Sequence, residues 1–273
     1  MAFVFGEDEK GNKLTVEVNQ GQQMSVSAPL LEMSLEHVTG YRSIVIEGNK
    51  DSLDTGTEDI WGGVGDLSYL TAAETMNIAS TDANDTSAGT GARTVKIKGL
   101  DSAHLEIEET VVLNGVANVL TSNSYLRVSS IEVLTAGSGQ ENAGDITATA
   151  STAATVQCFM ATSIGISKNS QFTVPANKKF VIISAEMNAT KTIAGLTPNV
   201  SIDAMARKLG VSADAPWLTL VRRKIDTEVI DQLLVLQTVG SVIDEKSDLR
   251  FRATTDQNNT EVRVRYYGVL VNK

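Results

Sequence analysis

Alternation of apolar and polar side chains at every second position is the main pattern in this chain, and it is typical of β-strands with one buried face. It is visible from Leu14 onward. Val95 and Ile97 alternate with lysines, and Leu105 and Ile107 alternate with glutamates. Only a short connection at residues 99–102 separates these two runs. We therefore expect them to form a hairpin or neighbouring strands.

The phase of the alternation changes once within an otherwise continuous run. Leu126 and Val128 occupy even positions, whereas Ile131 and Val133 occupy odd ones. A β-bulge or a strand break at residues 129–130 would account for this change.

The C-terminal part of the sequence is also typical of strands. Pro175 cannot donate a ladder hydrogen bond, so it predicts a strand end, with residues 176–177 turning the chain. Residues 200–210 fit helical and strand spacing alike, and the surrounding pattern favours a strand. Residues 233–242 are mostly apolar and could form a buried strand. Alternation in residues 249–253 and 262–267 predicts a closing hairpin.

The length of the chain and its segments of small residues suggest more than one domain. With 273 residues the chain exceeds the usual size of one domain. Segments of small, polar residues occur at 82–91, 135–144 and 148–155, and the first two are rich in glycine. The last segment is a candidate boundary, although it could also be a strand of small residues. We expect a mainly β protein with little helix, consisting of an N-terminal attachment segment (1–55) and two β-sandwich or jelly-roll-like domains (56–160 and 161–273).

Charge and composition limit the partners. A net charge of −10 makes nucleic acid an unlikely ligand, because phosphates are bound by basic surfaces. No window approaches about 18 uninterrupted apolar residues, and the first residues lack the basic and apolar regions of a signal peptide. We therefore expect no membrane contact and synthesis as a soluble protein in a cytoplasm. The single cysteine, Cys158, lies in an apolar run and is interpreted as a buried, inert thiol.

Residues that carry chemistry are scarce. The two histidines, His37 and His104, have no nearby cysteine or histidine to complete a metal site. Glycine clusters such as residues 62–65 lack the remainder of a phosphate-binding motif. Glu106 and Glu108 share one strand face, where a solvated row is the simpler interpretation than a catalytic pair, and residues 82–86 offer only an incidental cation loop. We predict no catalytic residues, no cofactor and no metal, and hence no enzyme.

Two features suit contact with partner proteins. Each tryptophan lies beside turning chain, and buried aromatic side chains anchor interfaces well, although both could be ordinary core residues. Four arginines alternate along the predicted closing hairpin and could pair with carboxylates of a neighbouring copy, or could simply be solvated. The candidate interface residues are Trp61, Trp217, Arg250, Arg252, Arg263 and Arg265.

Two stretches resemble structural proteins of tailed bacteriophages, particularly phages of marine and freshwater bacteria. The first contains Asp-Ile-Trp-Gly-Gly at 59–63, then residues 71–76, 89–95, 99–101 and 109–115. The second joins Phe-Thr-Val-Pro-Ala at 172–176 to residues 243–253. The resemblance implies a virion component with β-sandwich or jelly-roll-like domains, present in many copies and without enzymatic activity.

The leading hypothesis is a non-catalytic virion protein of the tail, the neck or collar, or a fibre adaptor. It would assemble as a homo-oligomer in a symmetric structure and bind at least one other virion protein. A capsid decoration or cement protein is an alternative. Another is a host-recognition module that binds carbohydrate through Trp61, Trp217 or Tyr125, and a third is a glycosidase that uses a carboxylate pair such as Glu106 and Glu108.

Overall fold

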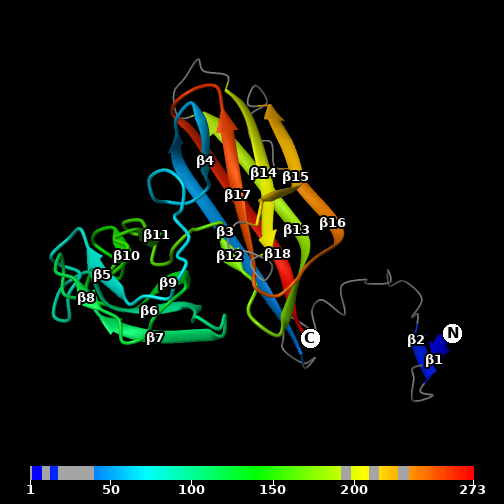
Figure 1. Cartoon of the computed structure of the whole chain (residues 1–273), viewed down its shortest axis with the longest axis horizontal. Coiled ribbons are helices and arrows are strands. Elements are labelled where there is room, and N and C mark those ends of the chain that lie inside the picture. Colours follow the sequence, from blue (N-terminus) through cyan, green and yellow to red (C-terminus); the bar gives the residue numbers. More distant parts are fainter. Residues whose placement is uncertain (1, 8–12, 18–39, 192–197, 209–214, 227–233) are drawn as a thin grey trace. The chain divides into compact units, whose positions relative to one another are not determined.

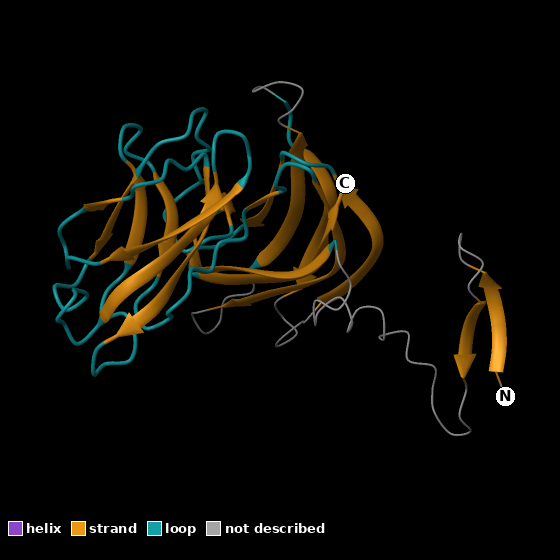
Figure 2. Ribbon diagram, turned by 90° about the horizontal axis from the view of Figure 1, so that it is seen from below, coloured by secondary structure: helices purple, strands orange, loops and turns teal. Residues whose placement is uncertain are grey.

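The computed structural model describes residues 2–7, 13–17, 40–191, 198–208, 215–226 and 234–273, with the backbone alone at 2–7, 13–17, 226 and 234–241. Throughout these ranges the regular elements are strands, which confirms the expected mainly β fold (Figure 2). None of the residues in these ranges forms a helix long and apolar enough to cross a membrane.

Contacts divide the chain into two units, residues 1–42 and 43–273. In the first unit, β1 (Ala2–Glu7) pairs antiparallel with β2 (Lys13–Glu17). The alternation that begins at Leu14 therefore forms a strand, as predicted.

Two sheets form the larger sandwich, called the main sandwich here (Figure 1). One sheet has the order β12-β17-β14-β15, with β4 also paired to β17, and the other has the order β16-β13-β18-β3. The strands are β3 (Tyr41–Leu53), β4 (Gly56–Asp59), β12 (Phe172–Thr173), β13 (Lys178–Lys191), β14 (Asn199–Lys208), β15 (Leu218–Asp226), β16 (Leu234–Ile243), β17 (Ser247–Thr255) and β18 (Thr260–Asn272).

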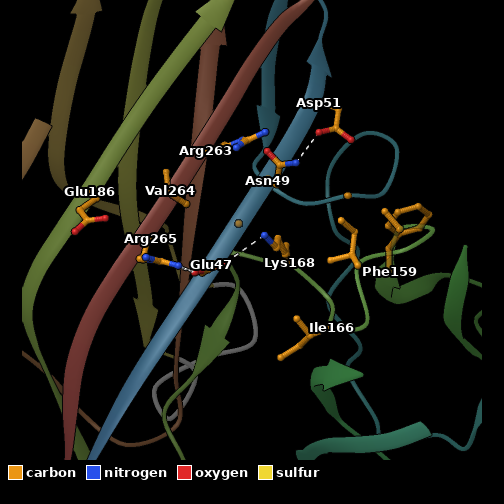
Figure 3. A pocket seen from close by; sticks show the side chains of 14 residues that line it. Glu47, Asn49, Asp51, Phe159, Ile166, Lys168, Glu186, Arg263, Val264 and Arg265 are labelled. Atoms are coloured by element: carbon orange, nitrogen blue, oxygen red, sulfur yellow. Dashed lines mark hydrogen bonds and ion pairs between the residues drawn. The ribbon is translucent and has the colours of Figure 1, made fainter. Parts of the chain in front are cut away.

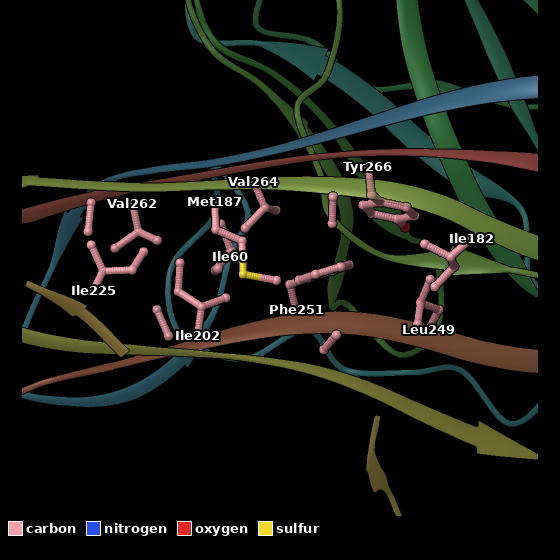
Figure 4. Packing of buried hydrophobic residues seen from close by; sticks show 14 of the residues in the cluster. Ile60, Ile182, Met187, Ile202, Ile225, Leu249, Phe251, Val262, Val264 and Tyr266 are labelled. Carbon is pink, nitrogen blue, oxygen red and sulfur yellow. The ribbon is translucent and has the colours of Figure 1, made fainter. Parts of the chain in front are cut away.

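The core of the main sandwich lies between its two sheets (Figure 4). Phe251 of β17 stacks on Tyr266 of β18 with ring centroids 4.8 Å apart, so an aromatic pair bridges the sheets. Phe180 of β13 meets the same tyrosine edge-on at 6.3 Å. Burial of these large apolar side chains is the main source of stability in such a sandwich.

A second pair of sheets forms the inserted sandwich, between β4 and β12 in the sequence. Its sheets have the orders β11-β10-β5-β8 and β7-β6-β9 and enclose their own buried cluster. The strands are β5 (Met76–Ser80), β6 (Ala92–Leu100), β7 (Glu106–Val112), β8 (Val119–Leu120), β9 (Arg127–Ala136), β10 (Ile146–Ala150) and β11 (Val156–Met160).

Sheet membership differs from the expected division at residues 55 and 160. Before the inserted sandwich begins, β3 and β4 already belong to the main sandwich, where β4 pairs with β17. Residues 43–55 therefore belong to the main sandwich and not to the predicted N-terminal attachment segment (1–55). The glycine-free segment 148–155 closes the hairpin from β10 to β11 instead of marking a boundary. Small residues fit a tight turn as well as a linker, so composition alone did not distinguish them.

Several local predictions are confirmed. Strands β6 and β7 pair antiparallel, with Lys98 opposite Glu108. In β9 the register against β6 shifts between Ser130 and Val128, which leaves Ser129 as the extra residue of a β-bulge. The chain turns at Asn177, whose φ is 61°. The ambiguous segment is strand β14.

The predicted closing hairpin is wrong in one respect. Residues 247–255 and 260–272 are strands, but β17 and β18 lie in opposite sheets of the main sandwich. Their apolar sides face the same core, which is why both alternate. Arg250 and Arg252 consequently lie on the outside of one sheet, and Arg263 and Arg265 lie on the outside of the other.

Substitution Gly99→Ala is expected to lower the free energy of unfolding by about 1–3 kcal/mol through overpacking. Gly99 lies at the bulge, where a Cβ would fall 2.2 Å from the carbonyl oxygen of Arg127. Because that oxygen is part of the backbone, the strands themselves must shift. Urea unfolding measures the change, with Ser102→Ala in the adjoining exposed turn as the control. Equal midpoints for both variants would contradict the prediction.

Candidate functional site

Arg250 and Arg252, two predicted interface residues, are turned toward carboxylates of the same chain. Arg250 Nη1 lies 3.4 Å and Arg252 Nε 3.2 Å from Oδ1 of Asp59, which is fully buried at the end of β4. Arg252 Nη2 also donates to Asp66 at 2.5 Å. The structure thus uses both guanidinium groups internally.

A second buried carboxylate joins the two sandwiches. Asp248 of β17 accepts two hydrogen bonds from Arg127 of β9, at 3.0 and 3.1 Å. Arg207 of β14 donates to it at 2.7 Å and Thr173 at 2.6 Å. Asp248 is fully buried and Arg127 nearly so. Bidentate pairing of this kind fixes orientation as well as distance, so it sets how the inserted sandwich meets the main one.

Aromatic rings fill the spaces between these arginines. Tyr69 lies between Arg127 and Arg207, at 5.0 and 4.9 Å from ring centroid to guanidinium carbon. Trp217 lies between Arg207 and Arg250, at 4.7 and 3.9 Å. The five side chains form a chain of cation–π contacts from β9 to β17, called the cation–π ladder here, and the rings of Tyr69 and Trp217 also contact each other with centroids 5.4 Å apart.

Trp217 therefore packs inside this ladder and is half-buried. Trp61 is 3% exposed and donates its Nε1–H to the carbonyl oxygen of Gly65 at 2.7 Å. Both tryptophans thus have intramolecular roles, and contact with a partner protein stays a prediction for each.

Burial raises the pKa of Asp59 to about 6; Arg250 opposes this shift and the charge of Asp66 adds to it. The unfolded carboxyl has its ordinary value of 3.8. Because the folded pKa is the higher one, the stability that Asp59 contributes is greatest below pH 3.8 and is lost as the pH rises through 6.

Substitution Asp59→Asn is expected to remove the loss of stability that ionisation of Asp59 causes as the pH rises. The stability of the variant relative to the wild type should increase between about pH 4 and pH 7, by at most about 3 kcal/mol. Urea unfolding of both proteins at a series of pH values measures the difference, in which the other titrating groups largely cancel. A difference that does not vary with pH would refute the assignment.

Arg263 and Arg265, on the opposite sheet, face a groove of about 530 Å³ (Figure 3). Arg265 forms an ion pair with Glu47 of β3, and Lys168 approaches the same carboxylate at 3.5 Å. Arg263 pairs with Glu261 along its own strand and is 65% exposed. Phe159, Ile164 and Ile166 form an apolar wall opposite these charges. The four predicted arginines are thus two separate pairs.

The carbohydrate alternative loses the residues proposed for it. Tyr125 is fully buried and Trp61 is nearly so, which leaves neither ring a free face for stacking on a sugar. The ring of Trp217 already packs against the guanidinium groups of Arg207 and Arg250. The exposed carboxylates behave as predicted for a solvated row, since Glu108 pairs with Lys96 and Glu106 with Lys178 at 3.4 and 3.7 Å.

The remaining candidates can be placed individually. Cys158 is fully buried, as predicted, and burial raises its pKa to about 11, which favours the protonated thiol. Burial together with the charges of Arg127 and Lys246 lowers the pKa of His104. His37 lies outside the described residues.

The proposed cation loop at 82–86 has a different use. Asp85 is fully buried, and its carboxylate accepts hydrogen bonds from Ser80 Oγ and from three backbone N–H groups. Among the residues with described side chains, no group of three or more His, Cys, Asp or Glu side chains is placed to hold a metal ion.

Comparisons with known proteins give little further guidance. No family model matches the chain, and no curated protein matches it. A structure of infectious bursal disease virus, Gt strain, is 11% identical, with 89% of this chain and 78% of that chain covered and a TM-score of 0.22. A bacterial lipoprotein from Bacteroides thetaiotaomicron is 11% identical, with 81% and 95% covered and a TM-score of 0.20. The VP2 subviral particle of infectious bursal disease virus is 9% identical, with 89% and 78% covered and a TM-score of 0.20. Likeness at these TM-scores does not establish a shared fold.

Proposed function

We propose that this chain is a non-catalytic structural component of a tailed-phage virion that acts through protein–protein assembly. Its place would be the tail, the neck or collar, or a fibre adaptor, where it binds copies of itself and other virion proteins. The starting point is the resemblance to phage structural proteins of motifs within residues 59–115, and of residues 172–176 together with 243–253.

The observation that carries the proposal is the use of buried charge. Asp59 and Asp248 bind Arg250, Arg252, Arg127 and Arg207, and the second of these carboxylates ties the inserted sandwich to the main one. Buried ionic groups of this kind need mutual pairing to be tolerated, and once paired they define one arrangement. A block of two sandwiches in a fixed arrangement suits a subunit that must repeat its contacts in a symmetric particle.

The test is detection of the chain in purified particles of the virus that encodes it. We expect quantitative mass spectrometry to find it in a fixed ratio to the major head protein, and antibody labelling in electron microscopy to mark the tail or neck. Labelling over the head would favour the decoration alternative instead. Absence from particles that retain their other proteins would overturn the proposal. Reducing-end release from polysaccharide by the purified chain would also overturn it.

A further inference from the structure

A loop after β4 presents one apolar side chain to solvent. Val64 is 96% exposed at the tip of the segment Trp61–Asp66. Single exposed aliphatic residues are common and need no explanation by themselves. The surroundings of this one are unusual, because the loop that carries it is fastened at several points.

Four hydrogen bonds fix the loop. Trp61 Nε1–H donates to the carbonyl oxygen of Gly65 at 2.7 Å, and Lys50 Nζ donates to that of Gly63 at 2.8 Å. The carboxylate of Asp66 accepts from the backbone N–H of Asp59 at 3.1 Å and from Arg252. The backbone of the loop also lies flat on the indole, since a Cβ at Gly63 would fall 2.3 Å from the ring of Trp61. Val64 is therefore held in place before any partner arrives, which lowers the entropy cost of contact.

The groove described above borders the same loop. Gly62 lines it together with the apolar wall of Phe159, Ile164 and Ile166. The two isoleucines are 45% and 46% exposed, so the wall is open to an incoming side chain. A fixed apolar tip and an apolar recess thus lie next to each other.

The charges of the groove identify the kind of partner. The charged lining residues are Glu47, Asp51, Glu186, Lys168, Arg263 and Arg265, which sum to 3 − 3 = 0. The whole chain carries −10, so two copies repel each other over most of their surface. The lining of the groove has no net charge, so this repulsion is weaker there. Because the lining contains both positive and negative side chains, the surface can complement a second copy of itself.

We propose that this face is a contact between two copies of the chain, in which Val64 of one copy enters the groove of the other. The contact can be reciprocal about a two-fold axis or can repeat head to tail around a ring. The inference rests on the proposed function, because it names the surface through which the subunit assembles with itself.

The test measures self-association of the purified full chain. Sedimentation equilibrium is run at protein concentrations from about 1 to 100 μM, a range that spans typical subunit affinities. We expect the wild type to associate. Val64→Asp should raise the dissociation constant by about tenfold or more, because the variant loses an apolar contact and adds a buried charge. The matched control is Val116→Asp, which places the same change at a valine that is 65% exposed in a turn of the inserted sandwich. Urea unfolding shows whether both variants fold as the wild type does.

A charge variant gives an independent measurement. Arg263→Gln should also weaken association, whereas Arg223→Gln on the exposed edge strand β15 should not. A wild-type chain that stays monomeric over the whole range would overturn the inference, and so would folded Val64→Asp that associates like the wild type. Loss of glycan-array binding in Val64→Asp with no change in association would overturn it as well. In each case, detection in particles still decides the proposed function separately.

Discussion

Substitution Asp248→Asn is expected to lower the free energy of unfolding by about 3–5 kcal/mol, because it leaves buried guanidinium charge without a counter-charge. Arg127 and Arg207 both bind this carboxylate, and their side chains are only 8% and 14% exposed. Asparagine keeps the shape of the side chain but has one acceptor oxygen and no charge. The same substitution removes the buried ionic connection between the inserted and main sandwiches.

Urea or guanidinium unfolding measures this loss. The control is Asp244→Asn, whose carboxylate pairs with Lys208 at 3.0 Å but is 50% exposed, so its pair should contribute about 1 kcal/mol at most. A two-stage transition in Asp248→Asn would indicate that the sandwiches now unfold separately. Similar midpoints for the two variants would show that Asp248 does not hold the junction.

The pH dependence of Asp248 has the opposite sign to that of Asp59. Burial by itself would raise the pKa of Asp248, but the charge and hydrogen bonds of Arg127, with further bonds from Arg207 and Thr173, hold it below 3.8. Its contribution to stability is therefore complete above pH 3.8 and is lost as the pH falls through the folded pKa.

Substitution Asp85→Ala is expected to lower the free energy of unfolding by at least about 3 kcal/mol. The carboxylate accepts the backbone N–H groups of Ala92, Ala143 and Gly144 at 2.7, 2.8 and 2.9 Å. Ala92 is distant in the sequence from Ala143 and Gly144, and the carboxylate of Asp85 binds both segments. Each buried N–H left without an acceptor costs about 1–3 kcal/mol.

The matched control is Asp82→Ala in the same loop. Asp82 accepts a single backbone hydrogen bond, from Asn84 at 2.7 Å in an exposed position, so its loss should cost about 0.5–1.5 kcal/mol. Chemical unfolding compares the two variants, and hydrogen exchange at Ala92 and Gly144 reports the local effect. Unchanged exchange at these amides in folded Asp85→Ala would contradict the assigned role.

Much of the strand content could be predicted from the sequence because burial of one strand face imposes a period of two. The bulge at Ser129 was visible for the same reason, since an extra residue must shift the phase. Which strands pair with one another was harder to predict from the sequence. Strands β17 and β18 are close in sequence and alternate in the same way, yet they face each other across a core. Alternation reports which side is buried and says nothing about which strand lies alongside.

The candidate site was only partly visible for a related reason. Arg250 and Arg252 were recognised, but Asp59, which pairs with both, lies in a segment that gave no sign of burial. The cluster of Arg127 and Arg207 around Asp248 was not recognised at all. Trp61 was singled out as a contact residue, whereas the structure uses it to support the tip at Val64. The Gly-Gly-Val-Gly run at 62–65 was the available signal, because a lone apolar residue among turn glycines has nowhere to be buried.

The position of the inserted sandwich has a consequence for synthesis of the chain. Both of its ends lie on β17, where β4 pairs with residues 252–255 and β12 with residues 248–249. On the ribosome, β3 and β4 emerge long before β17 and β18, the strands beside which they will lie. The strands of the inserted sandwich pair only with one another, so this sandwich can fold during that interval. We therefore expect a nascent chain in which the inserted sandwich is already folded, whereas β3 and β4 remain unpaired until β17 and β18 have been synthesised.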